Sequence, residues 1–216
     1  MLQPDFQIPP IFSYVAVFLW ALSGAIVGMH KRYDLAGVFV IALLAATGGS
    51  TLRDGLFLQQ VPPVLTNPWY IVMTALATVA LGFFRERIAR MTLVDRVINV
   101  IDAIGVPAFA VIGMQLSLDA GVPLPGVVLI GMVNGFGGGI LRDLMVGDTP
   151  VVLKPGRFYL SAAFLACLLF VVLVAGFDVN NSLAAWSVIA LFVLIRVLSL
   201  RYDWQTQPVL PPQGPQ

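Results

Sequence analysis

A short pattern occurs twice in this chain, and each copy interrupts a long apolar stretch with small residues followed by an arginine and an aspartate. The first copy is Gly-Gly-Ser-Thr-Leu-Arg-Asp from Gly48 to Asp54, and the second is Gly-Gly-Gly-Ile-Leu-Arg-Asp from Gly137 to Asp143. Glycine is a poor helix former, and a charged pair is costly to place inside a membrane. This combination restricts the folds open to the chain more than any other feature of the sequence.

The two copies belong to a longer internal repeat. The differences 142 − 53 and 143 − 54 both give 89, and the same ungapped offset aligns further identical residues. These pairs include Ala21 with Ala110, Gly24 with Gly113, Gly37 with Gly126, Ile41 with Ile130 and Tyr70 with Tyr159. A unit of this length is too long for a solenoid repeat. We therefore interpret the chain as a tandem duplication of a block of several spans.

The composition indicates an integral membrane protein. Of the 216 residues, 59% are hydrophobic and 11% are charged, which lies outside the range of soluble globular domains. The net charge of +1 gives no basis for a nucleic-acid partner. Cys167 is the single cysteine, so the chain forms no internal disulfide and no cysteine-based metal site.

Seven stretches are long and apolar enough to cross a membrane, which takes about 20 residues of helix. They run over residues 11–29, 35–59, 68–84, 97–116, 122–146, 158–177 and 183–200. We expect an all-α membrane protein with one transmembrane domain over residues 1–204. Its first repeat covers 11–84, its second covers 97–177, and a seventh helix covers 183–200. The Pro- and Gln-rich tail, 205–216, is expected to be disordered.

The orientation follows from the number of spans in each repeat. Three spans is an odd number, so the second repeat enters the membrane from the opposite side and the repeats are inverted. Lys and Arg gather after the first, third, fifth and seventh spans, which the positive-inside rule assigns to the cytoplasm. We expect the N-terminus outside and the C-terminus in the cytoplasm.

The glycine runs have two interpretations. We favour kinks that break the second and fifth helices beside a substrate or ion path at the repeat interface. The alternative is that the small residues only allow neighbouring helices to approach closely. The kinks are assigned to Gly48, Gly49 and Ser50 in the first copy and to Gly137, Gly138 and Gly139 in the second.

The charged residues after each run also have two interpretations. Arg53 lies 18 residues after Leu35, or roughly 27 Å along a helix, near the outer edge of the membrane, and Arg142 lies near the inner edge. We expect Arg53, Asp54, Arg142 and Asp143 to set the electrostatics and gating of two opposite mouths, with purely structural pairing as the alternative. Adjacent helical residues do not face each other, so each arginine is expected to pair with a neighbouring helix.

Further polar residues stand beside the runs. Thr47, Thr51 and Asn134 offer oxygen atoms that suit a partly dehydrated alkali cation, so they are candidates to line a pore. The alternative is that they satisfy loosened backbone groups. Arg196 in the last span is expected to snorkel towards the inner surface. The sequence holds no catalytic constellation, and we expect neither an enzyme, nor a cofactor, nor a metal other than transient K⁺.

The doubled Gly-Gly-x-x-Leu-Arg-Asp motif, together with the segment Ala21 to Ala25 in the first span, resembles the prokaryotic members of the trimeric intracellular cation channel (TRIC) family. The resemblance covers about residues 11 to 200. It implies an inverted three-plus-three repeat with an added seventh helix. It also implies that the second and fifth helices are kinked at the glycines and line the pore. A homotrimer with a potassium-permeable pore in each protomer is implied as well.

On this basis we expect a potassium-permeable monovalent cation channel, gated at the glycines, in the lipid of a prokaryotic inner (cytoplasmic) membrane. A second hypothesis is a secondary carrier of a small amino acid such as glycine, because some sequences of this kind are described so. A carrier would use the same inverted repeats, with half-helix N-termini facing the substrate carboxylate. The polar interruptions disfavour a third class, a membrane scaffold without transport.

Overall fold

The computed structural model of this chain describes residues 10–84, 94–154, 159–202 and 204. All regular elements within those residues are helices. The tail that we expect to be disordered, and the arginines between residues 85 and 93, lie outside the described residues.

The first repeat forms three main helices. They are α1 (Pro10–His30), α2 (Leu35–Leu52) and α4 (Trp69–Phe83). The π-helix η1 (Arg53–Leu58) continues α2, and the single-turn helix α3 (Pro63–Thr66) leads into α4.

The second repeat follows the same plan, and a further helix comes after it. In chain order the elements are α6 (Val94–Asp119), α7 (Leu124–Met145), the 3₁₀ turn η2 (Val151–Leu153), α8 (Leu160–Val171), the π-helix η3 (Val172–Gly176) and α9 (Asn181–Arg201). Among the described residues, α9 has no counterpart in the first repeat.

Local signals explain where several helices begin and end. Asp34 caps α2, because its side chain accepts a hydrogen bond from the Gly37 backbone N–H at 2.8 Å. Asn180 caps α9 in the same way. Gly121 and Gly147 follow the ends of α6 and α7 with φ values of 73° and 76°, a conformation that costs glycine little.

Five helices of the described chain are long and apolar enough to cross a membrane. The third helix of each repeat is shorter than our predictions of 68–84 and 158–177: these helices span Trp69–Phe83 and Leu160–Gly176. Pro68 stands at the N-cap of α4, whose 15 residues extend about 22 Å, less than the hydrocarbon core of roughly 30 Å. Within the part of the chain that the structure describes, five helices and not seven therefore have full spanning length.

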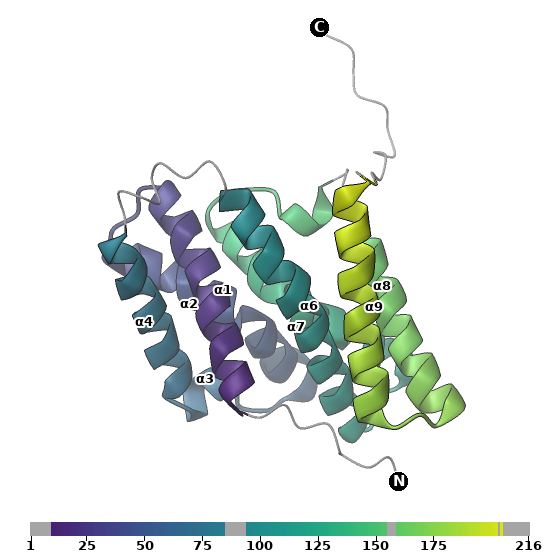
Figure 1. Cartoon of the computed structure of the whole chain (residues 1–216). Coiled ribbons are helices and arrows are strands. Elements are labelled where there is room, and N and C mark those ends of the chain that lie inside the picture. Colours follow the sequence, from purple (N-terminus) through teal and green to yellow (C-terminus); the bar gives the residue numbers. More distant parts are fainter. Residues whose placement is uncertain (1–9, 85–93, 155–158, 203, 205–216) are drawn as a thin grey trace, which may run out of the picture.

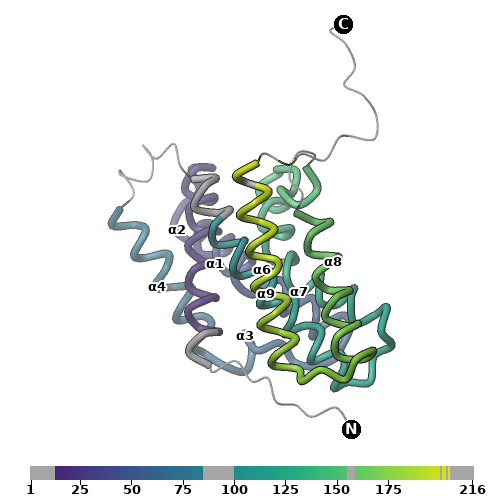
Figure 2. The backbone as a smooth tube through the Cα atoms, turned by 45° about the vertical axis from the view of Figure 1, so that its right-hand side comes forward, coloured from purple at the N-terminus to yellow at the C-terminus, as the bar shows by residue number. Residues whose placement is uncertain are grey.

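The helices form one bundle with the two repeats in opposite orientations (Figure 1). α1 begins at the lower edge of the view, whereas its repeat mate α6 begins at the upper edge. α2 and α7 lie behind α1 and α6, and α4 and α8 lie at opposite sides of the bundle in both views (Figures 1 and 2).

Two polar contacts mark the two ends of this bundle. The Lys31 Nζ atom lies 2.7 Å from Asp148 Oδ1, which joins the chain after α1 to the chain after α7. At the other end, Asn67 Nδ2 donates to the Tyr14 hydroxyl at 2.9 Å, which joins the start of α1 to the segment before α4. The chain after α1 and the chain after α7 thus meet at one end of the bundle, and the start of α1 meets the segment before α4 at the other. This is the arrangement that inverted repeats require.

The glycine runs lie where α2 crosses α7. A Cβ atom on Gly49 would lie under 3.0 Å from the backbone carbonyl oxygen of Asn134, and one on Gly138 would lie equally close to that of Ala45. These are equivalent contacts, since Asn134 and Ala45 are themselves repeat mates. The two helices thus touch backbone to backbone, which only glycine allows.

This contact changes our interpretation of the glycines. Helical hydrogen bonding continues through Gly48 and Gly49 in α2 and through Gly137 to Gly139 in α7, so the predicted breaks in these two helices are not found. The irregular segment starts later, at Arg53, where α2 widens into η1. Close packing, the alternative interpretation, accounts for the glycines because the facing helix supplies tight van der Waals contacts in place of a side chain.

We expect Gly49→Ala and Gly138→Ala each to destabilise the protein by about 1–3 kcal/mol, because the new methyl group must push a backbone carbonyl aside. The matched control is Gly82→Ala in α4, where a Cβ atom meets no other atom within 4 Å. The control should be neutral or slightly stabilising. Thermal unfolding in one detergent measures all three, and equal midpoints for Gly82→Ala and Gly138→Ala would contradict the close contact.

Candidate functional site

The arginine and aspartate of the first motif are buried together at the start of η1. Arg53 is 4% exposed and Asp54 is 3% exposed. The guanidinium group donates two hydrogen bonds to the carboxylate, from Nε to Oδ1 and from Nη2 to Oδ2, each at 2.6 Å. Its Nη1 atom donates to Asn134 Oδ1 on α7 at 3.1 Å. The arginine thus links its own aspartate to the other repeat.

Asn134 joins three elements at this point. Its side chain is fully buried, and its Nδ2 atom donates to the backbone carbonyl of Phe109 on α6. Gly113 leaves room for it, since a Cβ atom there would lie 2.7 Å from the Asn134 Cβ. Asn134 therefore ties α6 and α7 to the start of η1.

The second motif forms a similar arrangement near the other end of the bundle. Arg142 Nε donates to Asp143 Oδ1 at 2.8 Å, and Arg142 Nη1 donates to the Ser23 hydroxyl on α1. The second carboxylate oxygen of Asp143 accepts the Val151 backbone N–H at 3.0 Å. Arg142 is 2% exposed and Asp143 is 6% exposed.

We call Arg53, Asp54 and Asn134 the first clasp, and Arg142, Asp143 and Ser23 the second clasp. In each clasp the arginine of one repeat donates to an acceptor in the other repeat. The acceptors are not repeat mates: the offset of 89 places Ala45 opposite Asn134 and Ile112 opposite Ser23. The exchange between repeats is reciprocal, but each half uses a different residue.

The expected pairing of the arginines was right in one respect and wrong in another. Each arginine does reach a neighbouring helix, through Nη1. Each also pairs with the aspartate next to it in sequence, which the helical spacing did not predict. The reason is the length of the side chain and the fork of five N–H groups, whose Nε edge folds back to the carboxylate while Nη1 points away.

The hydroxyl groups near the first glycine run are occupied by their own helix. Thr47 donates to the Leu43 carbonyl at 2.8 Å, and both Ser50 and Thr51 donate to the Thr47 carbonyl, at 2.9 and 2.8 Å. Thr47 and Ser50 are buried and Thr51 is exposed. This geometry favours the alternative interpretation, in which these residues satisfy backbone groups.

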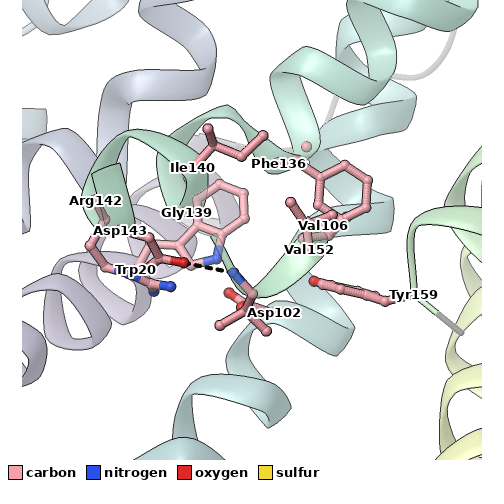
Figure 3. Close-up of a pocket in the computed structure, with 12 residues that line it drawn as sticks. Trp20, Asp102, Val106, Phe136, Gly139, Ile140, Arg142, Asp143, Val152 and Tyr159 are labelled. Atoms are coloured by element: carbon pink, nitrogen blue, oxygen red, sulfur yellow. Dashed lines mark hydrogen bonds and ion pairs between the residues drawn. The ribbon is translucent and has the colours of Figure 1, made fainter. Parts of the chain in front are cut away.

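A small cavity of about 20 Å³ lies beside the second clasp (Figure 3). Residues from α1, α6, α7 and η2, together with Tyr159, surround it, and its charged lining comes from Asp102, Arg142 and Asp143. The volume suffices for about one water molecule. Among the residues that the structure describes, no group of three or more His, Cys, Asp or Glu side chains is placed to hold a metal ion.

Arg196 on α9 is a buried residue that our sequence analysis assigned to the surface. It is 1% exposed, and its Cζ atom lies 4.3 Å from the centre of the Tyr159 ring. Snorkelling is therefore wrong for this side chain, because the aromatic ring holds the guanidinium group inside the bundle. The sequence did offer a signal for this residue. Arg196 lies within an apolar span, five residues before its end, and a charged residue in a span is a candidate functional residue by default.

Comparison with known proteins agrees with the duplication. The model of a family described as "Glycine transporter" matches the chain twice, over residues 10–86 and 99–175. Both ends of the second match lie 89 residues after those of the first, as 99 − 10 and 175 − 86 show. The chain belongs to this family. The predicted internal repeat is confirmed by the second match.

Relatives of this glycine transporter family occur in several bacteria. A UPF0126 membrane protein of Deinococcus radiodurans is 38% identical over 69% of this chain and 68% of its own length. The UPF0126 membrane protein YvgT of Bacillus subtilis is 30% identical over 90% of this chain and 93% of its own length. The UPF0126 inner membrane protein YadS of Escherichia coli K12 is 27% identical over 87% of this chain and 89% of its own length. The chain is a multi-pass membrane protein.

Solved structures share the fold over nearly the whole chain. One, described under "Structural basis for conductance through TRIC cation channels", is 26% identical with a TM-score of 0.80 and covers 97% of this chain and 99% of its own. A TRIC orthologue from Rhodobacter sphaeroides is 27% identical with a TM-score of 0.80. The match covers 90% of this chain and 98% of the orthologue. The resemblance that the doubled motif indicated is thereby confirmed.

We expect Asn134→Ala to destabilise the protein by about 2 kcal/mol or more, because it removes two buried hydrogen bonds and leaves Arg53 Nη1 without its acceptor. The control is Thr51→Ala, at an exposed side chain that bonds only its own helix, with an expected change within about 0.5 kcal/mol. Unfolding of both variants in the same detergent measures the difference. Equal losses would show that Asn134 is not a connecting residue.

Proposed function

We propose that this protein is a potassium-permeable monovalent cation channel with a pore in each protomer of a homotrimer. The observation that carries the proposal is the match to a TRIC cation channel structure over 97% of this chain and 99% of that one, with a TM-score of 0.80. The clasps fit such a role. Buried arginines would repel a permeating cation, but each is neutralised by its own aspartate.

The glycine crossing of α2 and α7 acts as the gate in this proposal. The two backbones touch at Gly49 and Gly138, so an ion path between these helices is closed in this conformation. Conduction then requires α2 and α7 to move apart at the glycines. The clasps hold the crossing from both sides, since Arg53 and Arg142 each bridge the repeats.

The proposed orientation places the N-terminus outside and the C-terminus in the cytoplasm of the inner membrane. The Lys31–Asp148 ion pair and Lys154 lie at the end of the bundle that we assign to the cytoplasm. α4 and α8 complete the seven spans in this proposal, across a locally thinned bilayer.

A glycine carrier is the second candidate, favoured by the description of the family whose model matches both repeats. Inverted repeats that meet at a central crossing also suit alternating access. The cavity beside the second clasp, at about 20 Å³, has room for about one water molecule and is too small for an amino acid. A carrier would therefore need a substrate site that opens in another conformation.

Recording from the purified protein in planar bilayers with asymmetric KCl distinguishes the two candidates. A channel gives discrete unitary currents that reverse near the potassium equilibrium potential and do not change when glycine is added. Electrical silence, together with saturable glycine uptake into matched liposomes, would reject the channel and support the carrier.

A disulfide across the crossing tests the gate. The Cβ atom of a residue at position 48 would lie 3.7 Å from Leu141 Cβ, within the range of about 3.5–4.5 Å that disulfides adopt. In a background where Cys167 is replaced by Ala, we expect Gly48→Cys with Leu141→Cys to lose current on oxidation and regain it on reduction.

The matched control carries Gly48→Cys alone in the same background. Its current is expected to stay the same when the oxidant is added. Undiminished current in a protein whose disulfide is shown to be complete would reject the crossing as the gate.

A further inference from the structure

The chain between α2 and α4 carries no charge. We call residues 55–68 the apolar connection; it contains no Asp, Glu, Lys, Arg or His, and neither does α4 after it. The offset of 89 aligns it with residues 144–157, which include Asp148, Lys154 and Arg157. We propose that the apolar connection lies in the lipid of the bilayer, at the edge of the hydrocarbon core, and not in water as a loop between two spans.

The apolar connection exposes large hydrophobic side chains. Leu65 is 75% exposed. The exposed apolar surface continues from the connection onto α4, and its members include Leu56, Val61, Leu65, Trp69, Ile71 and Leu76. In the proposed topology α4 crosses the membrane, so its exposed face meets lipid, and this inference rests on that crossing. The connection extends the same surface without a polar boundary.

The start of α4 lies level with the first turn of α1, at the lower edge of the bundle (Figure 1). The Tyr14 ring lies 6.4 Å from the Trp69 ring and 5.9 Å from the Tyr70 ring, measured between centres. Tyr14 comes four residues after the first residue of α1, which is about 6 Å along the helix. The 21 residues of α1 extend about 31 Å, enough to cross the hydrocarbon core. The end of α4 that meets the connection is therefore inside the span of α1.

The short length of α4 leads to the same depth. Its 15 residues extend about 22 Å, which leaves about 8 Å of a core of roughly 30 Å uncovered. An apolar chain at this level covers the remainder, so the bilayer has to thin less around α4. A charged chain could not do so without bringing its charges into lipid.

Lipid offers no hydrogen bonds to a loop backbone, so a chain in this position must satisfy its own. Residues 59–69 include three prolines, which carry no N–H group. Five of the other N–H groups have acceptors close by in the chain. Gln59 and Gln60 donate to the Asp54 carbonyl, Leu65 to that of Pro62, Asn67 to that of Pro63, and Trp69 to the Asn67 side chain. The connection thus has the backbone pairing that a place in lipid requires.

Lipid fits this surface better than water does. Tyr and Trp favour the boundary between the hydrocarbon and the headgroups, and Tyr14, Trp69 and Tyr70 meet at this level. The Asn67 Nδ2 atom donates to the Tyr14 hydroxyl at 2.9 Å, which gives both polar groups a partner within the protein. In water, the same segment would expose a contiguous apolar patch.

Spin labels on single cysteines test the position of the connection. In the Cys167→Ala background, a nitroxide is attached at Leu65→Cys, at Leu76→Cys on α4, or at Ala120→Cys. Ala120 is exposed between α6 and α7, at the same end of the bundle as the connection. The protein is placed in phosphatidylcholine vesicles, and relaxation of each label is measured with oxygen, which concentrates in lipid, and with a nickel chelate, which stays in water.

We expect the labels at positions 65 and 76 to respond to oxygen and to lose the response to nickel, and the label at 120 to show the reverse. A label at 65 that nickel reaches as readily as the label at 120 would overturn the proposal. A label at 65 that neither reagent reaches would also overturn it, because a protein surface such as a second copy of the chain would then cover the connection.

The label at position 76 separates this inference from the proposed topology. A label at 76 in water would reject the crossing of α4 and this inference with it. A label at 76 in lipid with the label at 65 in water would reject this inference alone. Neither reading depends on whether the protein is a channel or a carrier. Val61→Cys, at another exposed side chain of the connection, gives the same test if Leu65→Cys does not fold.

A pair of near-isosteric substitutions tests the cost of charge at this position. We expect Leu65→Asp to unfold several degrees below Leu65→Asn in the same vesicles at neutral pH, because only the aspartate brings a charge into lipid. Ala120→Asp and Ala120→Asn should unfold at the same temperature. Equal midpoints for the two substitutions of Leu65 would place the connection in water and refute the inference.

Discussion

The structure depends on the cost of placing two guanidinium groups within a membrane bundle. Arg53 and Arg142 are almost fully buried, and each uses both edges of its fork: one edge for the aspartate beside it, the other for an acceptor in the opposite repeat. Breaking such a pair by removing one partner is strongly destabilising, because it leaves an uncompensated buried charge. The clasps therefore bind the two halves of the molecule into one unit.

The glycine crossing and the clasps depend on each other. Backbone contact at Gly49 and Gly138 brings α2 and α7 close enough for Arg53 to reach Asn134. The crossing itself has few polar ties, since the hydroxyl groups of Thr47 and Ser50 bond within their own helix. The contact joins glycine backbones to facing backbone atoms and to the side chains of Leu52 and Leu141, so dispersion forces are its main source of stability. The polar connections at its two ends decide whether it stays closed.

Much of this arrangement could be predicted from the sequence, and what was missed has physical reasons. The offset of 89 predicted the repeats, and the odd number of spans in each repeat predicted their inversion, because duplication and hydropathy are properties of the chain itself. The near-complete burial of both Arg-Asp pairs was not predicted, since they were expected at two mouths of a pore. The continuity of α2 through Gly48 and Gly49 was missed, because glycine lowers helix propensity but packing against α7 outweighs it. The burial of Arg196 was missed because the ring that it contacts, Tyr159, lies 37 residues earlier, just before α8, beyond the reach of any local pattern. The repeat alignment shows the asymmetry of the acceptors, since Asn134 and Ser23 have Ala45 and Ile112 as mates, but it could not show that they accept hydrogen bonds from Arg53 and Arg142, because these contacts join residues far apart in sequence.

That asymmetry has a consequence for how the protein is made. Arg53 and Asn134 are 81 residues apart in sequence, and Ser23 and Arg142 are 119 apart. Synthesis proceeds from the N-terminus, so the first three helices enter the bilayer while the amide that Arg53 needs has not yet been translated. Until α7 arrives, Arg53 has Asp54 as its partner, but its Nη1 atom lacks the acceptor that Asn134 later supplies. Both contacts between the repeats are therefore completed only after the second repeat has been made.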